Sequence, residues 1–104
     1  MPLPEKNNQI ITIDEATNYT SAYRKQSSPD AIRGGLFWKE FVQKLLDQPG
    51  CAAMRYYHGM NADGKPVIVL VGVNNKGDDM TDGILLELSP LCPPICGSFN
   101  MLNS

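Results

Sequence analysis

The longest apolar run of the chain is VIVLVGV, residues Val67–Val73. A strand with one solvent-exposed face would carry a polar residue at every second position, and this run carries none. It therefore predicts a central β-strand hidden from water on both faces. A membrane-spanning helix needs about 20 apolar residues, so no membrane crossing is expected.

Two further strands are predicted on either side of this run. Residues 52–60 alternate between two faces, with Met54, Tyr56 and His58 on one of them. Asn61-Ala62-Asp63-Gly64 is typical of a hairpin turn, since its glycine tolerates a positive φ. Residues 84–88 form the third predicted strand, with Ile84, Leu86 and Leu88 facing inward.

Two helices are predicted before the sheet. The segment TIDE, residues 12–15, is a capping box that starts a helix over residues 13–26. Residues 37–47 repeat apolar side chains every three or four positions, which is typical of an amphipathic helix. We expect Phe37 and Trp38 to lie in the core, and Pro49-Gly50 ends the segment.

These elements predict an α+β fold in which two N-terminal helices pack on a three-stranded antiparallel sheet. A length of 104 residues favours a single domain over residues 1–104. Residues 1–9 are expected to form a loose arm and residues 89–104 an irregular C-terminal tail. Two helices cover one face of such a sheet, so the tail, the arm or a second copy of the chain must cover the other. A homodimer is therefore one expectation.

Composition excludes several function classes. The chain has 9 Lys and Arg against 11 Asp and Glu, so it lacks the basic surplus that binds nucleic acid. The first residues, MPLPEK, lack the basic and apolar segments of a signal peptide, and we expect a cytoplasmic location. Three cysteines, an odd count, do not suggest a disulfide scaffold.

Cys92 and Cys96 form the most distinctive chemical motif, a CxxxC pair on a proline-rich turn. Two thiolates at this spacing could bind Cu(I) or Zn(II) or cycle through a disulfide, with His58 as a candidate third metal ligand. Cys51 is seven residues from His58 along a strand, so the two project to opposite faces. The alternative interpretation is that Cys92 and Cys96 are small buried hydrophobes in a tail that covers the sheet.

Other polar groups give weaker signals. Arg55, Tyr57 and Lys65 could line a sheet face and bind an anion, or could form ordinary cross-strand pairs. The loop 74–83 resembles a calcium loop, but the third and twelfth residues counted from Asp78 are Met80 and Ser89, which cannot serve as the required ligands. No catalytic residue and no cofactor is predicted.

Several motifs resemble a family of short, uncharacterised bacterial proteins with a Cys-Pro-Pro-x-Cys-Gly tail. The motifs follow in order along the chain: IDEA (13–16), YR (23–24), RYYHG (55–59), VGV (71–73), GD (77–78) and CPPICG (92–97). The resemblance implies a free-standing single-domain protein and supplies no catalytic residues.

The functional prediction is a small, non-enzymatic binding or assembly module that self-associates through its sheet. Its protein partner, other than a second copy, is not identified by the sequence. The alternative is a metal-binding or redox protein that uses the Cys92/Cys96 pair.

Overall fold

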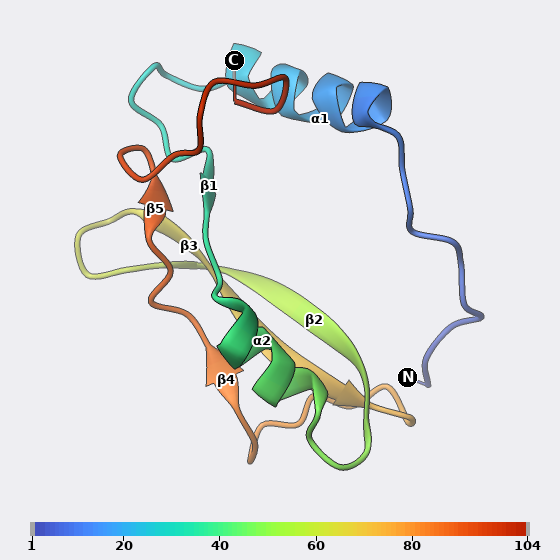
Figure 1. The fold of residues 1–104 in the computed structure, drawn as a ribbon. Coiled ribbons are helices and arrows are strands. Elements are labelled where there is room, and N and C mark those ends of the chain that lie inside the picture. The colour runs from blue at the N-terminus through green and yellow to red at the C-terminus, as the bar shows by residue number, and fades with distance from the viewer. Residues whose placement is uncertain (1, 104) are drawn as a thin grey trace. The chain divides into compact units, whose positions relative to one another are not determined.

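The computed structural model describes residues 2–103 and confirms an α+β protein with two helices and a three-stranded antiparallel sheet (Figure 1). The elements in chain order are α1 (Ile13–Lys25), β1 (Gly34–Gly35), α2 (Lys39–Leu46), β2 (Cys51–Met60), β3 (Pro66–Asn74), β4 (Leu85–Leu86) and β5 (Leu91–Cys92). Neither helix has the length and hydropathy that crossing a bilayer requires, within the residues described.

The chain divides into two compact units. The first contains Leu36–Ser89 and the N-terminal residues as far as Glu5, and it holds α2 and the three-stranded sheet. The second contains Lys6–Gly35 and the C-terminal residues from Pro90, and it holds α1, β1 and β5. The single domain over residues 1–104 stays a prediction, which equilibrium unfolding can test.

In the first unit the strand order is β2-β3-β4, so the valine-rich segment is the central strand, as predicted. The β2–β3 hairpin closes through Asn61, whose side-chain oxygen accepts from the backbone N–H groups of Asp63 and Lys65, both at 3.0 Å. Gly64 has a φ of 78°, the left-handed conformation that the turn requires of it. Local turn chemistry therefore sets the hairpin register.

The burial of β3 differs from the prediction along part of its length. Leu70, Val71, Gly72 and Val73 are consecutive and buried, so both faces are covered there. Ile68 is 38% exposed and Val69 is only half-buried. The reason is the length of β4, which has two residues and pairs only with Leu70 and Val71. Among the strands of residues 2–103, the first half of β3 therefore has only β2 as a neighbour.

The third strand is shorter than predicted because the chain leaves the sheet after Leu86. Leu88, expected to face inward, has a positive φ of 49° and is 91% exposed. Ile84, also expected inside, is exposed, and only Leu86 of the three is half-buried. The alternation of apolar residues predicted an inward face over residues 84–88. Within that segment, only Leu85 and Leu86 pair with β3.

Of the two helices predicted to pack on the sheet, α2 does so through contacts with β2, β3 and β4, whereas α1 belongs to the second unit. Its Leu45 is fully buried, at 0% exposure. Beyond the helix, the Gln48 side chain donates to the Leu45 carbonyl at 2.8 Å and accepts from the Ile84 N–H at 2.7 Å. The helix begins at Lys39, so Trp38 precedes it as N-cap and lies exposed rather than in the core, while Phe37 is half-buried.

Close packing continues on the face of β3 that carries Gly72. A Cβ added at Gly72 would lie 3.1 Å from the Cys51 Sγ, 3.1 Å from the Gln48 Nε2 and 3.3 Å from the Met80 Sδ. These distances are tighter than ordinary van der Waals contacts, so a larger residue would require the neighbouring side chains to shift by a few tenths of an ångström.

The second unit confirms α1 and its capping box. The Thr12 hydroxyl accepts from the Glu15 N–H at 3.1 Å, and the Glu15 carboxylate accepts from the Thr12 N–H at 3.3 Å. The tail, predicted to be irregular, contains β5, which pairs with β1 through Gly34 opposite Cys92 and Gly35 opposite Leu91. Two-residue strands show no periodicity, so this pairing had no sequence signal. Residues 2–9 form neither helix nor strand, and the loose arm over residues 1–9 stays a prediction.

Candidate functional site

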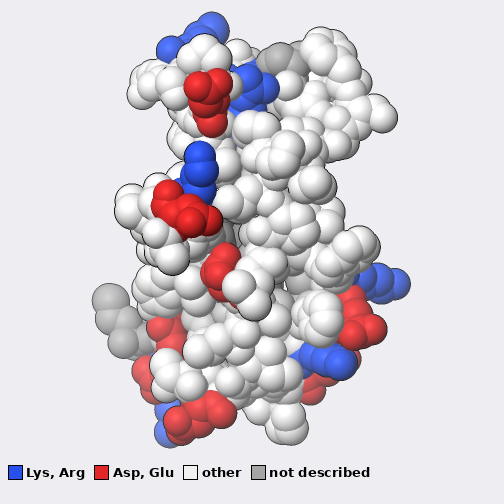
Figure 2. All heavy atoms as spheres, turned by 90° about the vertical axis from the view of Figure 1, so that its left-hand side faces the viewer, with Lys and Arg blue, Asp and Glu red and all other residues white. Residues whose placement is uncertain are grey.

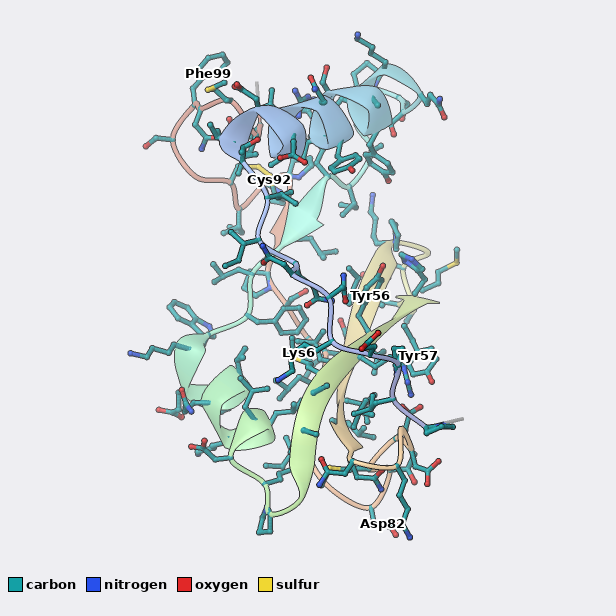
Figure 3. The ribbon with its side chains drawn as sticks, turned by 90° about the vertical axis from the view of Figure 1, so that its right-hand side faces the viewer. Lys6, Tyr56, Tyr57, Asp82, Cys92 and Phe99 are labelled. Atoms are coloured by element: carbon teal, nitrogen blue, oxygen red, sulfur yellow. A yellow bond between two sulfur atoms is a disulfide. The ribbon has the colours of Figure 1, made fainter. Side chains whose placement is uncertain are left out.

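The CxxxC pair lies in the second unit as a disulfide between Cys92 and Cys96 (Figure 3). The two Cα atoms are 4.9 Å apart, and the Ile95 N–H donates to the Leu91 carbonyl at 2.9 Å, which folds the intervening residues into a turn. Cys92 is half-buried and Cys96 is exposed. The alternative interpretation of both residues as small buried hydrophobes is therefore wrong.

His58, the candidate third ligand, lies on β2 in the first unit. Its exposed ring packs edge-on against Tyr56, with ring centroids 5.5 Å apart. In the described part of the chain, no group of three or more His, Cys, Asp or Glu side chains is placed to hold a metal ion. Cys51 is half-buried, and its thiol donates to the Ala53 carbonyl at 3.3 Å.

A polar cluster formed by Arg55, Tyr57 and Asp79 lies on one face of the β2–β3 pair. Arg55 forms an ion pair with Asp79, and the Tyr57 hydroxyl donates to the other carboxylate oxygen of Asp79. Arg55 also donates to the Gly77 carbonyl at 3.4 Å. The Arg55 charge is therefore neutralised within the unit. Arg55 and Tyr57, predicted to bind an external anion together with Lys65, instead bind the carboxylate of Asp79.

The cluster shifts the ionisation of its members. The hydrogen bond from Tyr57 lowers the pKa of Asp79, Arg55 adds to this effect, and partial burial opposes it. The hydrogen bond to Asp79 raises the pKa of Tyr57, and burial acts in the same direction. The same carboxylate raises the pKa of Arg55 through its hydrogen bond. The stable state is therefore a charged Arg55, a charged Asp79 and a neutral Tyr57.

These shifts predict how stability depends on pH. Because the folded pKa of Asp79 lies below that of an unfolded aspartate, about 3.9, its contribution is present above pH 4 and is lost as pH falls through the folded pKa. The contribution of Tyr57 is present below pH 10, the usual tyrosine pKa, and is lost as pH rises through its raised folded value.

Urea unfolding from pH 2 to pH 7 measures how the free energy of unfolding falls as Asp79 is protonated. Asp79→Asn should be less stable than the wild type at pH 7, and the two stability curves should converge at the acid end, where Asp79 is protonated. Asp78→Asn is the matched control, since Asp78 is the exposed neighbour and forms no side-chain hydrogen bond with another described residue. Parallel wild-type and Asp79→Asn curves over the whole range would contradict the assignment.

The outer edge of β2 is the longest unpaired strand edge in the described chain. The Asn61 N–H donates to the Lys65 carbonyl at 2.9 Å, and bonds between antiparallel strands alternate from there. Four residues therefore direct their backbone N–H and C=O groups away from β3: Met54, Tyr56, His58 and Met60. The side chains of all four are exposed, with Tyr56 at 60% and Met60 at 73%.

Comparisons of the chain with protein-family models, curated proteins and solved structures found no match. Sequence reasoning identified the residues of β2 but missed Asp79, which lies 22 residues from Tyr57 in a loop whose composition indicates only solvated turns. The isolated bridge between Val73 and Asp79 is what brings this carboxylate to the strand.

Proposed function

We propose that this chain is a non-enzymatic binding or assembly module that self-associates through the outer edge of β2. The observation that carries the proposal is the set of unpaired backbone groups on this ten-residue strand, combined with exposed apolar side chains at the same residues. A second copy is the partner that offers an equally long edge.

The sequence of β2 lacks the usual protection of an edge strand. Proteins protect such edges with proline, with lysine, with bulges or with very short strands. The ten residues CAAMRYYHGM contain no proline and no lysine, and their one charged side chain, Arg55, is paired with Asp79. The irregularity in pairing lies at the far end, between Cys51 and Ala53. The opposite edge, β4, has only two residues.

A two-fold axis perpendicular to the sheet would join two copies of β2 as antiparallel neighbours. Centred on Tyr57, this register pairs Tyr56 of one copy with His58 of the other, and Met54 with Met60. All four residues with outward backbone groups then form hydrogen bonds across the junction. Their side chains share one face, so the same pairing joins the exposed methionine and aromatic side chains of both copies.

Exposed apolar side chains accompany the outer edge of β2. Met54 is 43% exposed, Tyr56 60% and Met60 73%. Pairing with a second copy would remove part of this apolar area from water. Figure 2 views the side opposite to that of Figure 3, and on it acidic and basic side chains are interspersed among uncharged ones.

Sedimentation equilibrium at micromolar concentrations tests the proposal. The expected result is a reversible species of twice the 11.4 kDa chain mass, whose population rises with concentration. A clean monomer at every concentration would remove the self-association.

A second candidate function is thiol chemistry at the Cys92–Cys96 pair, and the disulfide between these residues favours the redox form of it. In such a cycle a dithiol reductant gives two electrons and two protons to the disulfide, which leaves two cysteine thiols and an oxidised reductant. In the cytoplasm, which is the location expected from the sequence, disulfides are usually transient and catalytic or sensing. Metal binding by Cys92, Cys96 and His58 would require the reduced pair.

Counting reactive thiols before and after reduction tests this second candidate. One reactive thiol, from Cys51, is expected in the oxidised protein and three after treatment with dithiothreitol. Elemental analysis of the reduced protein tests the metal form. Three free thiols in the untreated protein, together with no bound metal, would remove the candidate.

A further inference from the structure

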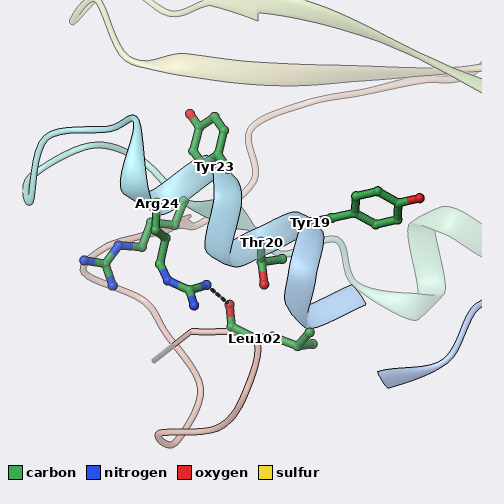
Figure 4. Close-up of a pocket in the computed structure, with 6 residues that line it drawn as sticks. Tyr19, Thr20, Tyr23, Arg24 and Leu102 are labelled. Atoms are coloured by element: carbon green, nitrogen blue, oxygen red, sulfur yellow. Dashed lines mark hydrogen bonds between the residues drawn. The ribbon is translucent and has the colours of Figure 1, made fainter. Parts of the chain in front are cut away.

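The second unit contains an open pocket that none of the functions above uses (Figure 4). Its volume is about 190 Å³. Helix α1 supplies four of its lining residues, and the segment before β1 and the C-terminal turn supply one each. The lining residues are Tyr19, Thr20, Tyr23, Arg24, Arg33 and Leu102. All six belong to the same unit.

The two arginines are held by backbone carbonyls of the C-terminal turn. Arg24 donates through Nη1 to the Leu102 carbonyl at 2.6 Å, and Arg33 donates through Nη1 to the Asn103 carbonyl at 3.5 Å. A guanidinium has five N–H donors, so each of these bonds uses one of five. The turn itself is fixed, because the Asn103 side chain donates to the Gly97 and Ser98 carbonyls at 3.2 and 3.1 Å.

The positive charge of these guanidinium groups is not neutralised within the described residues. Neither Arg24 nor Arg33 forms an ion pair with a carboxylate of residues 2–103. Asp14 and Glu15 lie in the first turn of α1, and nine residues of helix separate the Glu15 and Arg24 backbones by about 13 Å along the helix axis. The negative end of the α1 dipole carries about half a charge, which two guanidinium charges exceed.

We propose that this pocket binds the phosphate group of a phosphate monoester. A phosphate monoester carries a charge of about −1.5 to −2 at neutral pH, which matches two guanidinium groups better than a single carboxylate does. The planar N–H pairs of arginine suit phosphate oxygens geometrically. The Thr20 and Tyr23 hydroxyl groups already donate to the Thr17 and Ile32 carbonyls, so these groups are engaged within the unit. Tyr19 and Tyr23 contribute aromatic rings to the lining.

The size of the pocket limits what part of the ligand it holds. Sites that enclose a drug-sized ligand measure about 300–1,000 Å³, and this pocket is smaller and open. It therefore accommodates the phosphate and the first atoms of its ester, while the rest of the ligand lies over Tyr19 or Tyr23. An aryl ester would gain ring contacts with these tyrosines, and an alkyl ester would gain less.

Titration calorimetry with phenyl phosphate, glycerol phosphate and inorganic phosphate tests the proposal. All three should bind to the wild type and weaken as salt is raised. Arg24→Gln and Arg33→Gln should each weaken phenyl phosphate at least tenfold. Lys25→Gln is the matched control, since Lys25 follows Arg24 on α1 but does not line the pocket. The affinity of this variant for phenyl phosphate should stay within twofold of the wild-type value.

A further variant separates binding from folding, because Arg24 also holds the C-terminal turn. Arg24→Lys keeps a positive charge and a donor for the Leu102 carbonyl but loses the two parallel N–H groups of the guanidinium. The amide NMR spectrum of the C-terminal turn should therefore be retained. Phenyl phosphate should bind several-fold more weakly than to the wild type. Tighter binding of phenyl than of glycerol phosphate assigns an aryl ester, and equal binding assigns the phosphate group alone. No binding at tens of millimolar, or an equal loss in Lys25→Gln, would overturn the proposal.

The pocket and the β2 edge lie in different units, so the two proposals can fail separately. Sedimentation of the Arg24→Gln and Arg33→Gln variants should show the same self-association as the wild type.

Discussion

Replacing Leu45 by alanine is expected to lower the unfolding free energy of the first unit by about 2–5 kcal/mol. Leu45 is fully buried where α2 covers the sheet, and its loss leaves a cavity beside the covered part of β3. Small units have unfolding free energies of about 5 kcal/mol, so this one substitution could remove most of the stability. Urea unfolding followed by tryptophan fluorescence of Trp38 measures the change.

Leu46→Ala is the matched control for this prediction. It makes the same chemical change one residue further along α2, at a side chain that is 41% exposed. Its expected cost is below about 1 kcal/mol, because less apolar area returns to water. Equal losses in the two variants would contradict the assignment of Leu45 as the centre of the core.

Replacing His58 by proline is expected to weaken self-association at least tenfold while the monomer stays folded. The N–H of residue 58 points away from β3, so proline removes no hydrogen bond within the hairpin. In the proposed dimer the substitution removes one donor from each copy and places a proline ring against the facing strand. Sedimentation gives the dissociation constant, and circular dichroism reports the fold of the monomer.

His58→Ala separates the backbone effect from that of the side chain. It keeps the N–H and loses only the edge-on contact with Tyr56, so the dissociation constant should stay within a few-fold of the wild-type value. If alanine weakens association as much as proline does, the interface uses the side-chain face of β2 rather than its edge.

The ion pair of Arg55 connects stability with the proposed interface. Arg55 is the only charged residue of β2, and a free charge on an edge strand opposes pairing with another chain. Asp79 and Tyr57 hold this side chain against the unit that it belongs to. The cluster therefore stabilises the first unit through the Arg55–Asp79 ion pair. It also neutralises the one charge that would oppose pairing of β2 with another strand.

Elements with local signals could be predicted from the sequence. Thr12 and Glu15 satisfy each other's backbone groups within one turn, so the start of α1 was readable from four residues. The hairpin turn at Asn61–Gly64 depends on local hydrogen bonds in the same way. The central position of β3 followed from its continuous apolar composition.

Features that depend on distant pairing could not be predicted in this way. The two glycines at positions 34 and 35 predict an interruption of regular secondary structure. They form strand β1 because Leu91 and Cys92 lie opposite and pair with them. The partial exposure of Ile68 and Val69 on β3 follows from where β4 ends, and the sequence of residues 84–88 does not show this. The location of Asp79 beside Arg55 depends on the path of a polar loop, which carries no periodicity.

Amide hydrogen exchange of β2, followed residue by residue at two protein concentrations, tests the proposed interface most directly. At high concentration the N–H groups of Tyr56 and His58 should become protected, whereas dilution to the monomer should release them and leave Arg55 and Tyr57 protected by β3. Rapid exchange of Tyr56 and His58 at every concentration would contradict strand pairing between two copies.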